Sequence, residues 1–431
     1  MREINKNQLG NLKVFKFGGA SVKDAEAVQN MSKIIAAHSK EKLVVIVSAM
    51  GKMTNAFEDL LAKTIAEEPF EESVMEVKEF HGEIIKGLGL NHDLDLKAEL
   101  DTVYEQLSNE LNGYSSSFGY DYVYDQTVSL AEILSTKIVF AYLKKREIAS
   151  MWLDARKMVK TDSVHRQAIL DWGATQAMIK SQVKPFLEEK VVITQGFIGS
   201  NADYNTTTLG REGSDFSAAI FATSLDAESV TIWKDVPGVL NADPKKFENT
   251  KLYDKLPYKE AAEMTYYGAS VIHPKTIKPL AQKGIPLYVK SFGDMNASGT
   301  IIEECVVPNL NPAIIHKEKQ TVISFKISDF SFINEHHIHL IFEHIKRQNL
   351  IINLMQNSAI SFTICMDDNP KKREQLMNGL NDEFKIYYNE GLEMITVKNY
   401  NQDTIDELMK GKEVIIEQRS RNNFQMVFKV G

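Results

Sequence analysis

The apolar residues of the first 300 positions follow two spacings. Short runs such as LKVFKF (12–17) and KLVVIVSAM (42–50) are apolar at nearly every position, as buried strands are. Between these two runs an apolar residue recurs every three or four positions, the period of an amphipathic helix. The runs expected to form strands are 12–17, 42–50, 148–153, 191–197, 229–235 and 285–291. The alternation predicts an α/β domain over 1–300, a mainly parallel sheet with helices on both faces, from which the charged, helical residues 56–112 form an excursion.

The pattern changes from about residue 318. TVISFKISDF predicts a strand and NEHHIHLIFEHIKRQN a helix, and the order strand, helix, strand, strand, helix, strand continues to residue 391. This order is that of a ferredoxin-like unit. Residues 392–431 repeat part of it, and a strand from 300–316 would complete the second unit. We therefore expect a catalytic domain at 1–300, a linker and first small domain at 301–391, and a second small domain at 392–431.

Composition restricts the classes of function. An apolar fraction of 43% with 25% charged residues is that of a globular protein, and no run of about 18 apolar residues predicts a membrane span. Without a recognisable signal peptide, we expect a cytoplasmic protein. The formal net charge of −8, without a basic block, argues against nucleic acid as the main partner. Cys305 and Cys365 are too few for a disulfide framework, so we expect buried free thiols and no metal site.

The segment VFKFGGASVKD places Lys16, Gly18 and Gly19 between a strand and a helix. Glycines let backbone N–H groups approach phosphate oxygens, and the helix N-terminus and the lysine add positive charge. The segment fits neither the Walker nor the dinucleotide-binding pattern. The alternative is a tight turn with a surface lysine.

Two later loops carry further candidates. In TTTLGREGSDFSAAIFA (206–222), Arg211 precedes a helix start and suits a carboxylate, while Ser214 or Asp215 could simply cap that helix. IWKDVPGVLNADPK (232–245) is a loop at the carboxyl end of a strand, where ligands bind in open α/β sheets. Two ordinary turns would explain the same residues.

Taken together, five segments resemble the aspartate kinases of the amino-acid kinase superfamily. They are similar to that family's KFGGTS, SA-x-x-G-x-TN, TQGFIG…TTTLGRGGSD, WTDVPG-x-x-x-x-DP and AAEMA-x-x-GAKVLHP-x-T, and here read KFGGAS, SAMGKMTN, ITQGFIGSNADYNTTTLGREGSD, IWKDVPGVLNADP and AAEMTYYGASVIHPKT. The resemblance covers about 12–300 densely, and the tail loosely as two ACT-type regulatory domains. It implies an ATP-dependent, Mg²⁺-requiring phosphorylation of the β-carboxylate of L-aspartate to 4-phospho-L-aspartate, the first step of lysine, threonine and methionine biosynthesis.

The resemblance also implies roles at the phosphate end of the site. Lys16, with the backbone of Gly18 and Gly19, would hold the transferred phosphoryl group, and Asp215 would orient that lysine. The nucleotide side would include Ser48 and Asp235, with Mg²⁺ held mostly by phosphates and water.

At the acceptor end, the family's residues match positions of this sequence one by one. Arg211 would bind a substrate carboxylate and Glu132 the substrate ammonium, with Thr54, Phe197 and Ser214 completing the pocket. From the residues alone, Ser129-x-x-Glu132 is a capping box ahead of an apolar helix. The similarity of SLAEILST to the family's S-x-GE-x-LS favours the substrate role. His273, in a His-Pro pair at a helix break, is expected to be structural.

Departures from the family pattern gather on the nucleotide side. Ala20, Lys234, Leu240, Lys245 and Ser270 replace the family's threonine, threonine, tyrosine, arginine and lysine. Lys234 and Lys245 could restore charge near the phosphates.

The tail resembles an effector-binding module. INLMQNSAISF (352–362) is similar to the family's effector segment, with Asn353 and Ser358 at polar positions that would meet lysine or threonine. The alternative is that both residues only cap strands. Exposed sheet edges in the tail predict a homodimer through these domains. Other readings of the whole chain are a superfamily kinase with another acceptor, or a catalytically impaired amino-acid sensor.

Overall fold

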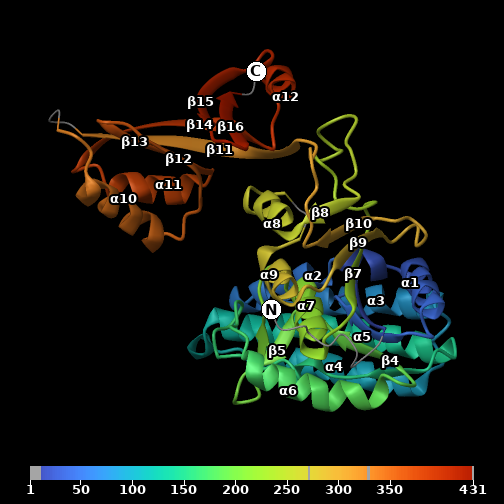
Figure 1. Cartoon of the computed structure of the whole chain (residues 1–431). Coiled ribbons are helices and arrows are strands. Elements are labelled where there is room, and N and C mark those ends of the chain that lie inside the picture. Colours follow the sequence, from blue (N-terminus) through green and yellow to red (C-terminus); the bar gives the residue numbers. More distant parts are fainter. Residues whose placement is uncertain (1–10, 270–271, 328–330, 430–431) are drawn as a thin grey trace. The chain divides into compact units, whose positions relative to one another are not determined.

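Strand β1 lies inside an eight-stranded sheet with the order β3-β4-β2-β1-β7-β9-β10-β8 (Figure 1). The computed structural model describes residues 11–269, 272–327 and 331–429. From β3 to β9 the neighbouring strands are parallel, and β10 runs antiparallel to β9. The strands are β1 Leu12–Phe17, β2 Lys42–Val47, β3 Ser150–Trp152, β4 Val191–Gln195, β7 Ser229–Lys234, β8 Lys255–Pro257, β9 Leu287–Ser291 and β10 Thr300–Glu303. A small separate sheet pairs β5 Ile198–Ser200 with β6 Thr206–Thr208.

Helices cover both faces of this sheet. Successive residues of a strand point to opposite faces, and Leu43 to Val47 in β2 are all fully buried, so neither face is open to water. Helix α5 packs against β2, β3 and β4, and helix α7 packs against β1, β2 and β7. The helices are α1 Ala25–Ala37, α2 Met53–Ile65, α3 Glu71–Gly87, α4 Leu94–Asn112, α5 Tyr120–Lys145, α6 Trp172–Val183, α7 Gly213–Leu225, α8 Tyr258–Tyr266 and α9 Pro274–Lys283. The predicted excursion at 56–112 corresponds to α2, α3 and α4. No helix of the described chain is long and apolar enough to cross a membrane.

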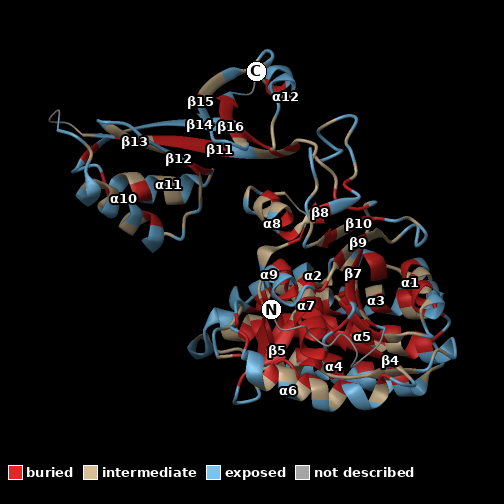
Figure 2. Ribbon diagram, viewed as in Figure 1, coloured by how far each residue is buried: buried red, intermediate tan, exposed pale blue. Residues whose placement is uncertain are grey.

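The chain divides into two compact units. The first holds the described residues up to Val239, with 252–262 and 272–307, and contains the eight-stranded sheet. The second holds 240–251, 263–269 and the described residues from Pro308 onward. Figure 2 shows that each unit has its own buried interior. The domain boundaries expected at 300 and 391 stay predictions.

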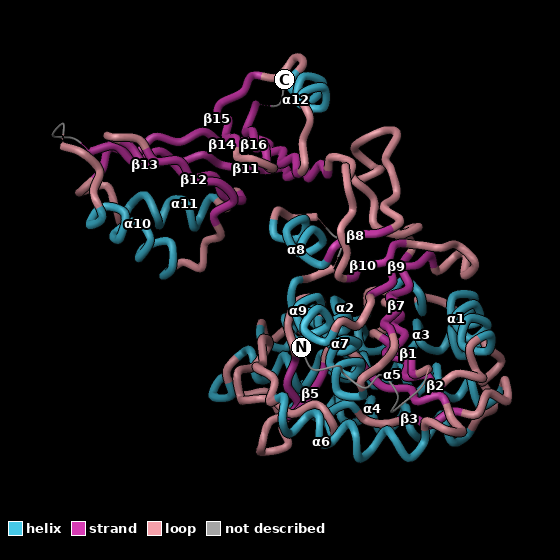
Figure 3. Tube along the Cα trace, viewed as in Figure 1, coloured by secondary structure: helices cyan, strands magenta, loops and turns pink. Residues whose placement is uncertain are grey.

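The second unit contains one six-stranded sheet with the order β12-β13-β11-β14-β16-β15 (Figure 3). Its elements are β11 Ala313–Ile327, α10 Glu335–Arg347, β12 Ile352–Asn357, β13 Ser361–Asp367, α11 Pro370–Asn378, β14 Phe384–Lys398, α12 Gln402–Met409, β15 Glu413–Arg419 and β16 Asn423–Lys429. Apolar clusters around Phe325 and Phe424 fill the spaces between sheet and helices. This arrangement confirms the two ferredoxin-like halves.

Two long strands join the halves, where the sequence suggested separate short ones. In β14, residues 384–398 run on past Gly391, whose φ of +68° accompanies a change of register opposite Gln320 in β11. A glycine beside two polar residues resembles a turn in sequence, but here it marks an irregularity inside a strand. The start of β11 pairs with the end of β14, from Ala313 opposite Lys398, whereas residues 300–303 form β10 of the other sheet; the completing strand expected from 300–316 stays a prediction.

The two cysteines are free thiols, as expected. Cys365 is buried, whereas Cys305 is partly exposed, which contradicts the expectation of burial for both. Cys305 follows β10 outside any helix or strand, where less of the chain covers it.

Candidate active site

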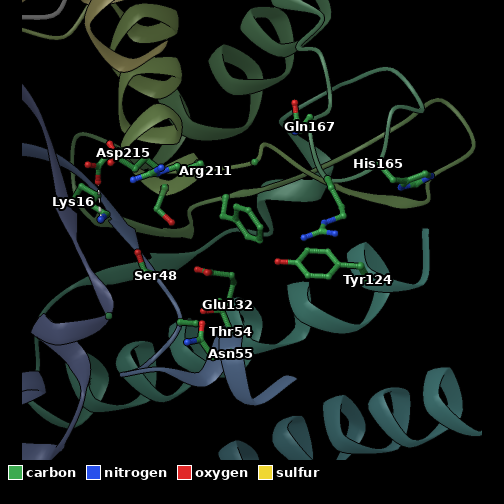
Figure 4. Close-up of a pocket in the computed structure, with 18 of the residues that line it drawn as sticks. Lys16, Ser48, Thr54, Asn55, Tyr124, Glu132, His165, Gln167, Arg211 and Asp215 are labelled. Atoms are coloured by element: carbon green, nitrogen blue, oxygen red, sulfur yellow. Dashed lines mark ion pairs between the residues drawn. The ribbon is translucent and has the colours of Figure 1, made fainter. Parts of the chain in front are cut away.

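A pocket of about 1140 Å³ lies at the carboxyl ends of the central strands (Figure 4). Lys16 and Lys234 lie at the carboxyl ends of strands β1 and β7. Ser48 and Phe197 lie in the loops that follow β2 and β4. The carboxyl edge of a parallel sheet is where loops converge and ligands bind. All lining residues belong to the first unit.

Lys16 and Asp215 form a buried ion pair on one side of the pocket. The Lys16 Nζ atom lies 2.7 Å from Asp215 Oδ1, and the two side chains are 12% and 5% exposed. Burial by itself would raise the pKa of Asp215, but the charges of Lys16 and Lys234 outweigh it and hold that pKa below its usual value. Asp215 is therefore a carboxylate that fixes the lysine.

The glycine-containing loop after β1 packs against the loop after β2. Gly19 accepts a hydrogen bond at its carbonyl from the Gly51 amide, at 3.0 Å. A Cβ atom at Gly19 would lie 2.5 Å from the Gly51 carbonyl oxygen and 2.9 Å from that of Ala49. Gly19 is therefore required by close backbone packing, and it lines the pocket. Gly18 precedes a short 3-10 helix (Gly19–Val22) and is not among the lining residues.

Glu132 reaches the pocket from the middle of α5. The capping-box interpretation is wrong, because α5 begins at Tyr120 and Ser129 donates to the Gln126 carbonyl inside the helix. Burial raises the pKa of Glu132 to about 8, against opposing effects of the Ala49 backbone and the Lys16 charge. Its Oε2 atom is buried and has no hydrogen-bond partner among the described residues. A buried carboxyl group without a partner is suited to a cationic group of a ligand.

The loop that carries Arg211 turns sharply before α7. Phe197 and Glu212 both have left-handed backbones, with φ of +71° and +54°. Glu212 is the N-cap of α7 without a side-chain cap, so neither Ser214 nor Asp215 caps the helix. Asp215 instead lies in its first turn, beside Lys16. Arg211 and Ser214 line the pocket next to Glu212, and Thr54 enters it from the first turn of α2.

One further sequence interpretation, that of His273, has an outcome in this region. His273 is the N-cap of α9, its ring accepting from the Lys275 amide, and its own amide donates to Glu212, which confirms the structural interpretation. Among the described residues, no cluster of three or more His, Cys, Asp or Glu side chains is arranged to hold a metal ion.

The predicted nucleotide residues are only partly gathered here. Ser48 and Lys234 line the pocket, whereas Asp235 is exposed just after β7 and does not. Lys245 belongs to the second unit, so its role stays a prediction. Ser270 lies outside the described residues.

The predicted effector residues are in the second unit, in internal hydrogen bonds. Asn353 accepts from Lys317 Nζ at 2.7 Å and donates to Asp367 at 2.8 Å. Ser358 closes the turn between β12 and β13 through Ser361.

One wall of the pocket carries residues that no motif had indicated. These residues lie on the first turns of α5 or in the loop after the short 3-10 helix η3 (Ala155–Lys157), and they are Asp121, Tyr124, Val164, His165, Arg166 and Gln167. The carboxylate of Asp125 ties this wall together, accepting from His165 and from the Arg166 and Thr208 amides. The order of residues gives no signal for this wall, because it forms only when α5 and the loop meet.

Replacing Gly19 by alanine should destabilise the protein. The added methyl group would meet two backbone oxygens, which can move less than a side chain, and overpacking of this kind costs about 1–3 kcal/mol. Gly18→Ala is the matched control, because its Cβ would meet no backbone atom and only the end of the Lys16 side chain, at 3.3 Å. Denaturant unfolding measures both variants, and equal losses would contradict the packing described for Gly19.

Glu132→Gln should stabilise the ligand-free protein in a pH-dependent way. Because the folded-state pKa is raised to about 8, the folded protein binds an extra proton between pH 4.5 and 8, and wild-type stability falls across that range. The variant escapes this loss. Its melting temperature should exceed that of the wild type by roughly a few degrees at pH 8 and by less at pH 5. Exposed Glu79→Gln is the control, and a difference that shrinks with rising pH would contradict the burial effect.

Comparison with known proteins places this pocket in a family. The model of the amino acid kinase family matches residues 11–291. Lysine-sensitive aspartokinase 3 of Escherichia coli is 32% identical over 368 residues, which cover 83% of this chain and 79% of the relative. Bifunctional aspartokinase/homoserine dehydrogenase 2 of Arabidopsis thaliana is 33% identical over 301 residues, and the match spans only 32% of that longer protein.

Solved structures agree with the sequence comparison. The crystal structure of E. coli aspartokinase III in complex with aspartate and ADP has a TM-score of 0.80 at 26% identity, covering 97% of this chain and 96% of that one. Aspartate kinase of Clostridium acetobutylicum shares the fold, with a TM-score of 0.79 at 22% identity, over 97% of this chain and 96% of that one. The eight-stranded sheet is therefore the amino-acid kinase fold, and the six-stranded sheet is a pair of ACT domains. The chain belongs to the amino acid kinase family and, within it, to the aspartokinases.

Proposed function

We propose that this chain transfers the γ-phosphoryl group of ATP to the β-carboxylate of L-aspartate, giving 4-phospho-L-aspartate and ADP. The observation that carries the proposal is one pocket that joins a buried Lys16–Asp215 ion pair to Arg211 and to the buried Glu132, whose Oε2 atom has no hydrogen-bond partner among the described residues. The first pair suits a phosphoryl group, and the other two residues suit an amino acid. The E. coli relative was solved with aspartate and ADP.

The acceptor end binds the zwitterionic part of aspartate. Glu132 pairs with the ammonium of aspartate. In the empty pocket burial keeps Glu132 protonated, and the positive charge of the bound ammonium favours its ionised form, so Glu132 releases its proton when aspartate binds. Arg211 binds the α-carboxylate as a planar fork of donors. Thr54, Phe197 and Ser214 complete this end and leave the β-carboxylate directed at the phosphate end.

The phosphate end stabilises charge that develops during transfer. Lys16 is held by Asp215, so its ammonium meets the transferred phosphoryl group without rearrangement, and the Gly18–Gly19 backbone adds amide donors. Because aspartate's β-carboxylate is already ionised at neutral pH, no general base is required. Ser48, Lys234 and Asp235 contribute to nucleotide binding, and a nucleotide-binding role for Lys245 stays a prediction. Mg²⁺ would be held mostly by the phosphates and water rather than by protein groups, and would supply positive charge to the phosphates.

Lys16→Met and Arg211→Gln should fail in different ways. Loss of Lys16 removes a charge that acts on the transferred group, so kcat should fall about 1000-fold. Loss of the Arg211 fork should raise KM for L-aspartate roughly 10- to 100-fold, with kcat and KM for ATP little changed. A coupled ADP assay measures both, with Arg146→Gln, an exposed arginine at the far end of α5, as control.

The same assay separates the alternatives. ADP release with a different acceptor but not with L-aspartate would identify another superfamily kinase. Amino-acid binding by calorimetry, without ADP release, would identify a sensor. An Arg211→Gln variant that loses affinity for ATP but not for aspartate would contradict the assignment of the two ends.

The second unit is proposed to bind an amino-acid effector, threonine rather than lysine. E. coli aspartokinase III was solved with lysine and aspartate. In this chain the Lys317 ammonium donates to the Asn353 side chain. The side-chain ammonium of a lysine effector, which threonine lacks, would meet a like charge there. The open edges of the sheet, β12 and β15, are where a homodimer would form.

Threonine should inhibit the kinase at lower concentration than lysine. Lys317→Met removes the competing charge, so lysine inhibition should strengthen by roughly 5-fold or more while threonine inhibition changes little. Exposed Lys385→Met, in β14, is the matched control. Inhibition constants from the ADP assay test this, and stronger inhibition of the wild type by lysine would contradict it.

A further inference from the structure

Tyr124 and Glu132 share one face of α5. They are eight residues apart, slightly more than two helical turns, so both side chains project to the same side of the helix. Both line the pocket. Figure 4 shows the Tyr124 hydroxyl pointing into the pocket, on the side where Glu132 lies, and across from the Lys16–Asp215 pair. The tyrosine therefore belongs to the acceptor end.

The Tyr124 hydroxyl is available to a ligand. The side chain is half-buried, and its hydroxyl has no hydrogen-bond partner within the described part of the chain. Burial, followed by the charge of Glu58, raises the pKa of Tyr124, while Arg166 acts in the opposite direction. At neutral pH the hydroxyl is therefore protonated and can donate a hydrogen bond.

Arg166 holds the Tyr124 ring in place. Its guanidinium lies 4.3 Å from the ring centroid of Tyr124 and 5.3 Å from that of Tyr120, so it lies against both rings. Its guanidinium nitrogens also lie 3.8 Å from a Glu58 carboxylate oxygen and 3.6 Å from an Asp121 carboxylate oxygen, just beyond hydrogen-bond length. No described residue accepts a hydrogen bond from this guanidinium, which is held between the two rings and the two carboxylates.

The backbone of Arg166 is itself constrained. Its φ is +64°, a conformation that non-glycine residues rarely adopt. The amide donates to both carboxylate oxygens of Asp125, at 3.2 and 3.1 Å. Asp125 also accepts from the Thr208 hydroxyl and amide, three residues before Arg211. An unfavourable conformation fixed by a buried carboxylate is typical of a residue whose position matters to a site.

We propose that Tyr124 is a further acceptor-binding residue and that Arg166 is its positioning residue. This inference rests on the proposed function. The α-carboxylate and the ammonium of aspartate share one carbon atom, so a donor that faces Glu132 from the pocket wall meets the α-carboxylate when the ammonium is at Glu132. Tyr124 donates its hydroxyl hydrogen to that carboxylate, beside the Arg211 fork.

Tyr124→Phe removes only the hydroxyl and keeps the ring against Arg166. We expect KM for L-aspartate to rise roughly 10-fold or more, as for a lost hydrogen bond to a charged group, with kcat and KM for ATP within about twofold of wild type. Tyr120→Phe is the matched control, since Tyr120 lies one turn earlier in the same stack and its hydroxyl is directed at Glu58. It should leave all three constants unchanged.

A double-mutant cycle tests the part assigned to Arg166. Arg166→Gln should raise KM for aspartate by a smaller factor, and Tyr124→Phe/Arg166→Gln should be no worse than Tyr124→Phe alone, because the arginine acts through the hydroxyl. Melting curves verify that each variant is folded. Additive effects would overturn the role of Arg166, and an unchanged KM in Tyr124→Phe would overturn that of Tyr124. If the unaltered chain releases no ADP with aspartate, it is the proposed function that fails.

Discussion

The buried ion pair between Lys16 and Asp215 is the contact on which the pocket depends. Lys16 belongs to β1, inside the sheet, and Asp215 to the first turn of α7, so the pair fixes where α7 begins relative to the sheet. Removing one partner would leave an uncompensated buried charge, which costs about 3–5 kcal/mol. Because Arg211 and Ser214 immediately precede Asp215, the same pair also determines where the acceptor loop lies.

Glu132 supplies the opposite constraint at the other end of the pocket. Its carboxyl group is buried without a hydrogen-bond partner for Oε2 among the described residues, and burial raises its pKa to about 8. The empty pocket is therefore less stable than one with an apolar residue at this position, and a cationic ligand removes the disadvantage. One end of the pocket is thus complete without ligand and the other is not. The complete end holds Lys16, which acts on the transferred phosphoryl group. The incomplete end holds Glu132, which selects the acceptor.

The sequence predicted most of the fold and the part of the site that lies in contiguous segments. Each of these site residues lies at the end of a strand, just after one, or near the start of a helix, and the spacing of apolar residues and the glycines mark such places in a sequence. The structure brings them into one pocket: Lys16, Gly19, Ser48, Arg211, Ser214 and Asp215. Glu132 was ambiguous, because a Ser-x-x-Glu spacing looks the same in a capping box and inside a helix. The start of α5 at Tyr120 resolved it. Tyr124 and Arg166 carried no signal, since their contact joins positions far apart in the sequence and depends on the hydrogen bonds that Asp125 accepts from the Arg166 amide. The long strand β14 was missed because Gly391 looks like a turn residue.

The central claim is that the β-carboxylate of L-aspartate receives the phosphoryl group. An acyl phosphate reacts with hydroxylamine to give a hydroxamate, so the most direct measurement is the amount of hydroxamate formed with MgATP and each of several acceptors. We expect aspartyl hydroxamate to form in step with ADP, with much less product from L-glutamate and about 1000-fold slower formation in Lys16→Met. ADP release without hydroxamate, or equal product from glutamate, would contradict it.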